Sequence, residues 1–149
     1  MLAELIWAAS KAFLSGTAIM LVIWAMGLTA SPLALWVVPL VFLVALTFAG
    51  LGLIMTALAP SYDFFMYYFT LFVTPTALIS GVFFPVDQLP ELLRTLADLL
   101  PLSHAVDLVR PLLLGRVPDD IALHLAVLAG YAAAGFQIAL VLARRRLLR

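Results

Sequence analysis

Asp107 and Arg110 carry opposite charges three residues apart, a spacing that brings side chains together on a helix. The simpler interpretation is a structural ion pair. The alternative is that Arg110 contacts an anionic substrate or a lipid headgroup, because a guanidinium can hold a phosphate or a carboxylate through two hydrogen bonds. Both residues are therefore candidates for a substrate pathway or its exit.

Two further residues stand out within long apolar stretches, Pro75 and Gln137. Proline frees a backbone carbonyl that a neighbouring hydroxyl or helix can satisfy, so Pro75, between Thr74 and Thr76, predicts a helix kink. This kink is either a static packing feature or a hinge for substrate passage. The amide of Gln137 either bonds a neighbouring helix or contacts a substrate. Both residues join the candidates for the pathway.

The other reactive side chains give little support to catalysis or metal binding. The chain has no cysteine, which excludes disulfides, thiolate metal sites and thiol nucleophiles. Two histidines, His104 and His124, are too few for a metal cage, and we interpret His124 as a polar residue at a membrane interface. The serines, histidines and acids form no nucleophile motif. We expect no enzyme site, no metal and no cofactor in this chain.

The composition requires a lipid environment. Hydrophobic residues make up 66% of the 149 positions and charged residues 11%, against roughly 25% charged residues in a soluble domain. The formal net charge of zero argues against a nucleic-acid partner. We therefore expect an all-α membrane protein surrounded by lipid.

The charge-free runs predict the helices that position these residues. A spanning helix needs about 20 mostly apolar residues, which predicts four spans near residues 12–28, 35–58, 64–86 and 121–143. Turn-prone residues 29–32 separate the first two spans. No repeat, linker or phosphate-binding Walker A loop is visible. We therefore predict one transmembrane domain over residues 1–149, without an ATPase domain of its own.

The basic tail predicts the orientation of these spans. Arg144, Arg145, Arg146 and Arg149 follow the last span, and the positive-inside rule places them in the cytoplasm. Four spans then put both termini in the cytoplasm and residues 87–120 outside. In that segment, leucines at helical spacing predict an amphipathic helix that Pro101 interrupts. A second short helix should follow over 102–114 and end at Gly115.

Two groups of residues have both a packing and a functional interpretation. Small residues in the second and last spans predict either packing within the chain or a dimer seam; they are Gly50, Gly52, Gly130, Ala132, Ala133, Ala134 and Gly135. Aromatic residues crowd the start of the third span, where they predict an anchor at the membrane boundary or a stacking site for a sugar; they are Phe64, Phe65, Tyr67, Tyr68, Phe69 and Phe72.

The outer segment also carries a family resemblance. The runs SGVFFPVDQLP at 80–90 and LPLSHAVDLVR at 100–110 resemble the signature of ABC-2 type permeases, in particular the nodulation-factor exporter branch. The resemblance covers nearly the whole chain. Members of the family usually have about six spans, so the four spans predicted here would match the last four. The chain then resembles the carboxy-terminal portion of a permease.

The resemblance implies partners and an activity. Such a permease forms a dimer, binds ABC ATPase subunits that bind and hydrolyse ATP, and exports an amphiphile across the inner membrane. The substrate would be a lipooligosaccharide, a polysaccharide or a drug-like molecule, and an amino-terminal permease half would be missing here. The rival interpretation is a truncated, non-transporting membrane protein or an assembly factor.

Four residues are candidates for contact with the ATPase subunit. Tyr62 and Asp63 lie in or beside the short connection from Ala59, which is the complete cytoplasmic loop of the predicted topology. Glu4 and Lys11 lie in the stretch before the first predicted span, which by resemblance would be the trailing end of the main coupling helix.

Overall fold

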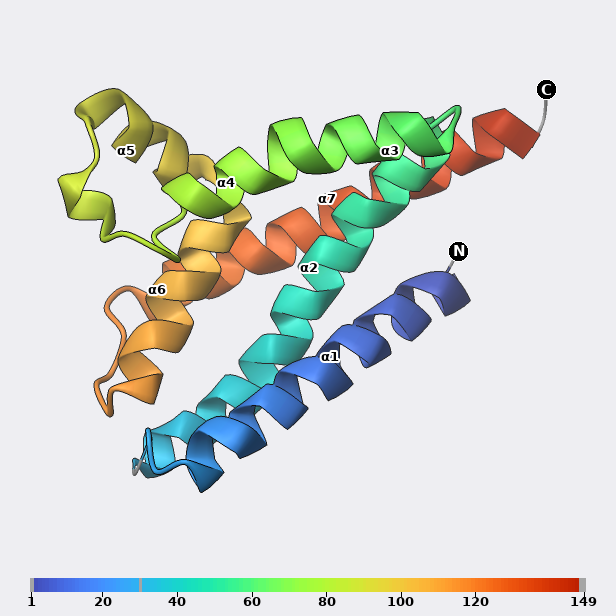
Figure 1. The fold of residues 1–149 in the computed structure, drawn as a ribbon. Coiled ribbons are helices and arrows are strands. Elements are labelled where there is room, and N and C mark those ends of the chain that lie inside the picture. Colours follow the sequence, from blue (N-terminus) through green and yellow to red (C-terminus); the bar gives the residue numbers. More distant parts are fainter. Residues whose placement is uncertain (1, 30, 148–149) are drawn as a thin grey trace.

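The computed structural model describes residues 2–29 and 31–147, and every regular element in them is helical (Figure 1). In chain order these elements are α1 (Leu2–Ala25), the 3₁₀ helix η1 (Pro32–Trp36), α2 (Val37–Leu58), α3 (Tyr62–Tyr68), the π-helical segment η2 (Phe69–Val73), α4 (Thr74–Ile79), the 3₁₀ helix η3 (Val86–Gln88), α5 (Glu91–Leu99), α6 (Pro101–Leu113) and α7 (Ile121–Leu147).

Three helical stretches are long and apolar enough to cross a membrane, judged by length and composition: Leu2–Ala25, Pro32–Leu58 and Ile121–Arg145. At most 22% of the most apolar window in any of them is buried inside the protein. A helix that is apolar around its circumference but little buried by protein needs lipid on its remaining faces. The all-α membrane fold expected from the composition is therefore confirmed.

Helix α2 lies between α1 and α7 and makes its most extensive contacts with α7 (Figure 1). The α2–α7 crossing is close because a Cβ added at Gly135 would lie 3.1 Å from the carbonyl carbon of Gly50. Gly50 and Gly135 thus pack against each other within the chain. Gly52 and Gly130 have nothing within 4 Å of an added Cβ, and Ala133 and Ala134 are exposed, so a dimer interface at these residues stays a prediction.

The third predicted span is shorter than expected. Helical structure runs from Tyr62 to Ile79 through α3, η2 and α4, and the chain turns at Gly81, whose φ is +79°. The apolar residues after Gly81 belong to that turn and do not extend the helix to residue 86. Beyond its own segments this helix contacts mainly α5, so much of its aromatic surface is left uncovered by the rest of the described chain.

The first helix also differs from the sequence prediction. Helix α1 is continuous from Leu2 and ends at Ala25, so Lys11 lies inside the helix and does not mark its start. A separate segment before residue 12 is not seen. The ammonium of Lys11 lies 5.0 Å from the centre of the Trp7 ring, a cation–π contact.

The bundle has two distinct ends. The start of α1, the end of α7 and the turn between α2 and α3 lie at one end, which we call the terminal end. The α1–α2 connection lies with α5 and α6 at the other, the distal end (Figure 1). Helices α5 and α6 form the distal cap, residues 91–113. Arg149 of the basic tail lies outside the described residues.

Candidate functional site at the distal end

Arg110 ties helix α6 to the turn that follows α4. Its Nη2 donates to the backbone carbonyl of Gly81 at 2.5 Å and lies 3.4 Å from that of Val82. The two stretches of the sequence signature therefore meet at this side chain. The predicted ion pair with Asp107 is not formed, because the guanidinium reaches back to these carbonyls instead.

The turn that receives Arg110 is tightly constrained. Gly81 has a positive φ of +79°, and a Cβ added there would lie 2.9 Å from Cγ2 of Val86. Only glycine adopts such a conformation without strain. The preceding Ser80 is fully buried and its hydroxyl donates to the carbonyl of Thr76. The turn thus presents its carbonyls to Arg110 in a fixed direction.

An apolar groove of about 520 Å³ lies beside this contact, between α2, α6 and the turn. Among the described residues, Arg110 is the only charged one that lines it; the others are Val41, Val44, Val82, Ala105, Val106, Val109, Leu113 and Leu114. Within the described part of the chain, Nε and Nη1 of Arg110 have no hydrogen-bond partner. An apolar cleft with a few polar donors at its edge suits an amphiphile whose head accepts hydrogen bonds.

Asp107 lies one turn before Arg110 on α6 and faces a mixed charge environment. Partial burial raises the pKa of its carboxyl above the usual value, and nearby Asp98 raises it further. His124, His104 and Arg110 act in the opposite direction by favouring the carboxylate. Desolvation is the dominant effect, so Asp107 binds a proton more readily than a free aspartate.

A histidine pair joins α6 to α7 beside Asp107. Nδ1 of His104 lies 2.6 Å from Nδ1 of His124, and Nε2 of His104 lies 2.9 Å from the carbonyl oxygen of Asp98. Tyr131 donates to the carbonyl of Leu99 at 2.7 Å. Among the described residues no group of three or more side chains suited to holding a metal is found.

Sequence reasoning missed this pair because the two histidines are twenty residues apart on different helices. One signal was present: His124 and Tyr131 are seven residues apart and so share a face of α7. That face meets the carboxyl end of α5, whose last carbonyls have no partner within their own helix. The cap is thus held by polar contacts as well as by leucines.

The remaining pathway candidates lie away from Arg110. Gln137 is exposed on α7 and lines a pocket of about 290 Å³ with Arg145, toward the terminal end. It makes no hydrogen bond to any described residue, so it does not join α7 to another helix of this chain. Pro75 follows the π-helical segment, and the hydroxyl of Thr74 donates to the carbonyl of Phe69 at 3.3 Å. The same carbonyl also accepts the backbone N–H of Thr74.

The ATPase-contact candidates are exposed toward the terminal end. Tyr62 is 80% exposed and Asp63 is exposed beside it at the start of α3, where Ser61 caps the helix by accepting from the backbone N–H of Phe64. Glu4 and Lys11 are exposed on the first half of α1.

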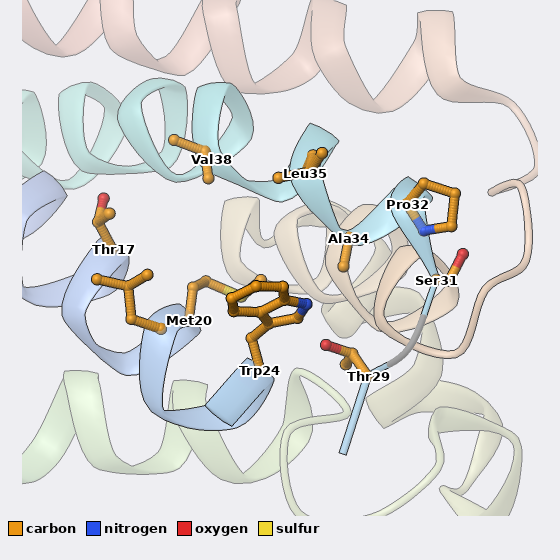
Figure 2. A pocket seen from close by; sticks show the side chains of 10 residues that line it. Thr17, Met20, Trp24, Thr29, Ser31, Pro32, Ala34, Leu35 and Val38 are labelled. Atoms are coloured by element: carbon orange, nitrogen blue, oxygen red, sulfur yellow. The ribbon is translucent and has the colours of Figure 1, made fainter. Parts of the chain in front are cut away.

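A second cavity of about 390 Å³ lies between α1 and the start of α2, also toward the distal end. Figure 2 shows Trp24 between Met20 and Thr29 in this cavity. Its described lining holds no charged side chain, and the buried hydroxyl of Thr29 has no hydrogen-bond partner there. The Arg110 groove therefore offers the stronger means of recognising a polar head.

Comparison with known proteins identifies the family. The model of the ABC-2 type transporter family matches residues 1–114. Nodulation protein J of Sinorhizobium fredii is 48% identical over 147 residues, covering 99% of this chain and 56% of the relative. The protein of the same name from Rhizobium leguminosarum bv. trifolii is 47% identical over 148 residues, with the same shares.

A more distant relative is the linearmycin resistance permease protein LnrN of Bacillus subtilis, 31% identical over 101 residues, 67% of this chain and 26% of the relative. No solved structure matches. The chain spans about half the length of the nodulation relatives it matches. The family match covers both signature stretches that Arg110 joins, and the chain belongs to the ABC-2 type transporter family.

Proposed function

We propose that this chain forms part of the membrane-spanning subunit of an ATP-driven exporter, and that it moves an amphiphile across the inner membrane. Membership of the ABC-2 family supports a transport role. The observation that carries the substrate class is the apolar groove with Arg110 at its edge. Its walls suit an acyl chain, and the free guanidinium nitrogens suit an oxygen-rich head. A lipooligosaccharide, a polysaccharide with a lipid anchor and a drug-like amphiphile all have this character.

In this proposal the distal end faces outward and the terminal end faces the cytoplasm. Helices α1, α2 with η1, and α7 span the bilayer, and the helix from Tyr62 to Ile79, which contains the π-helical segment η2, spans it as a fourth element. The basic residues in the last turns of α7 support this orientation through the positive-inside rule. The groove then lies near the exit.

The proposal requires partners, because nothing in this sequence resembles a Walker A loop. An ABC ATPase subunit would bind ATP and contact the terminal end near Glu4, Lys11, Tyr62 and Asp63. A second permease copy, together with lipid, would cover the exposed aromatic side of the Tyr62–Ile79 helix. The segment that corresponds to the other half of the relatives would complete the pathway.

Photolabelling tests the groove. A photoreactive single-chain amphiphile with a saccharide head is added to the full chain in lipid nanodiscs, and labelled peptides are mapped by mass spectrometry. We expect labels on α6 near Val109 and on α2 near Val41. The variant Val106→Trp should fill the groove and reduce these labels several-fold.

The matched control is Val38→Trp, which fills the second cavity instead. It should leave labelling of α6 unchanged. Labelling that is insensitive to Val106→Trp, or that falls only with Val38→Trp, would show that the amphiphile does not bind in the Arg110 groove.

A further inference from the structure

The hydrogen-bond pattern around the histidine pair determines where its protons lie. The carbonyl oxygen of Asp98 can only accept, so Nε2 of His104 carries a hydrogen and donates to it. In a neutral His104 the other nitrogen, Nδ1, therefore has a lone pair. The 2.6 Å contact then requires that Nδ1 of His124 donates the hydrogen between the two rings.

This contact accepts one additional proton and no more. When a first proton is added, one N–H still lies between the two Nδ1 atoms, and the free Nε2 of His124 takes the other hydrogen. When a second is added, both Nδ1 atoms carry hydrogens that point at each other across 2.6 Å, and two positive rings face each other in a site where His104 is 8% exposed. Like charges at that distance repel strongly in a partly buried site. The closed contact and the doubly charged pair are incompatible.

We propose that the His104–His124 contact is a proton-sensitive latch, which holds the distal cap on α7 and releases it when both imidazoles are protonated. The contact fits this role because His104 follows the α5–α6 junction and also caps the carbonyl end of α5. Loss of the contact loosens both helices of the cap. The proposal concerns the contact itself and does not depend on the transport function.

Several ionisable groups on the neighbouring helices lie near the histidine pair. On α6, Asp107 interacts with both histidines, and Arg110 lies one turn further on; on α5, Asp98 lies close to Asp107. Asp120 precedes α7, where its carbonyl accepts from the backbone N–H of His124, and α7 also carries Tyr131. Helix α2, which packs against both α6 and α7, contains no ionisable residue.

Asp107 is the counter-charge that makes a positive imidazole tolerable in the closed state. Because its pKa is raised by burial, it loses that charge early as the pH falls. Protonation of Asp107 in acid therefore removes this compensation and favours release.

Proton linkage determines whether acid favours the open or the closed state of the cap. At low pH the open state binds two additional protons and the closed state binds one, so acid favours the open state. Where the difference is one full proton, the ratio of open to closed molecules rises about tenfold for each unit of pH lost.

Distances between spin labels test the latch in the full chain in nanodiscs. The chain has no cysteine, so Leu92→Cys on α5 and Ile138→Cys on α7, both exposed, give one specific label pair. We expect a narrow distance distribution at pH 8 that becomes broader and longer at pH 5. A second pair at Leu14→Cys and Val141→Cys, also exposed, spans helices outside the cap and should not change.

Two variants of His124 distinguish a latch at the imidazole pair from a general effect of acid on the bundle. In His124→Asn the amide can donate to or accept from Nδ1 of His104, so the cap should stay closed at both pH values. In His124→Phe the ring remains but the hydrogen bond is lost, so the cap should be loose at both. In Asp107→Asn the shift should persist.

The proposal is overturned if the native chain shows no change between pH 8 and pH 5, or if His124→Asn keeps the full native response. Loss of the response in Asp107→Asn with its retention in His124→Asn would assign it to the carboxyl instead.

Discussion

Nη2 of Arg110 on α6 donates to the backbone carbonyl of Gly81, twenty-nine residues earlier in the chain. This single bond joins the two halves of the family signature, since one half forms the turn after α4 and the other forms α6. It also fixes one edge of the apolar groove. The signature thus encodes a turn, a helix and the side chain that holds them together.

Replacing Arg110 tests the importance of this bond. Arg110→Ala should lower the free energy of unfolding by about 1 to 2 kcal/mol, because a charged hydrogen bond to the carbonyls is lost at a partly exposed site. Hydrogen exchange of residues 81–86 should rise in the same variant. Arg110→Lys keeps the charge and should retain membrane abundance, but it should lower export because a lysine cannot hold the turn and an anionic head at once. Unchanged export by Arg110→Lys would exclude a role in substrate contact.

Gly81 should tolerate substitution worse than a glycine of similar backbone conformation. Gly81→Ala adds a methyl group 2.9 Å from Val86 Cγ2 at a φ of +79°, whereas Gly27→Ala adds one at a φ of +69° with nothing within 4 Å. Both variants incur the left-handed penalty of about 1 to 2 kcal/mol. The difference between their stabilities therefore measures the clash with Val86. We expect Gly81→Ala to have the lower melting temperature. Equal melting temperatures for the two variants would mean that the side chain of Val86 moves aside freely.

The α2–α7 crossing gives another matched pair. Gly135→Ala places a methyl group 3.1 Å from the backbone of Gly50, while Gly130→Ala on the same helix meets nothing within 4 Å. Helix propensity alone should stabilise both variants by up to about 1 kcal/mol. Overpacking against a backbone costs about 1 to 3 kcal/mol, so Gly135→Ala should be less stable than Gly130→Ala. Thermal unfolding in one detergent measures this, and the reverse order would contradict the close crossing.

The titration of Asp107 should make the stability of the protein depend on pH. Burial raises the pKa of its carboxyl in the folded state, so its contribution to stability is present in acid and is lost as the pH rises through the folded-state pKa. Asp107→Asn removes this titration. The stability of the variant relative to the native chain should therefore increase from pH 3.5 to pH 7. A stability difference between the two proteins that stays constant from pH 3.5 to pH 7 would contradict the raised pKa of Asp107.

The distal cap shows which features can be predicted from sequence. Leucines at helical spacing and Pro101 predicted two short helices; α5 ends at Leu99, just before Pro101, and α6 begins and ends within one residue of the predicted 102–114. Gly115 ends the cap with a φ of +74°, as expected for a residue after a helix. These features are local, because periodicity and backbone preference act within a few residues.

The features that sequence could not give depend on contacts across the bundle. The His104–His124 pair and the Arg110–Gly81 bond join positions 20 and 29 residues apart, and their geometry depends on how α6 packs.

The two misplaced span boundaries have local causes that composition does not reveal. The residues after Gly81 are as apolar as a span, so their composition predicts a longer helix, but the left-handed backbone at Gly81 ends it. Lys11 predicts a boundary because a charge within a span is costly. The helix nevertheless continues through Lys11, whose ammonium lies over the Trp7 ring.

The most direct test of the transport proposal is a search for the partner that supplies energy. The tagged chain is purified from detergent-solubilised native membranes, and co-purifying proteins are identified by mass spectrometry, with a Tyr62→Ala/Asp63→Ala variant as the control. We predict that an ATP-binding-cassette ATPase is recovered with the native chain and several-fold less with the variant. Recovery of the intact chain without any such ATPase would contradict the proposal.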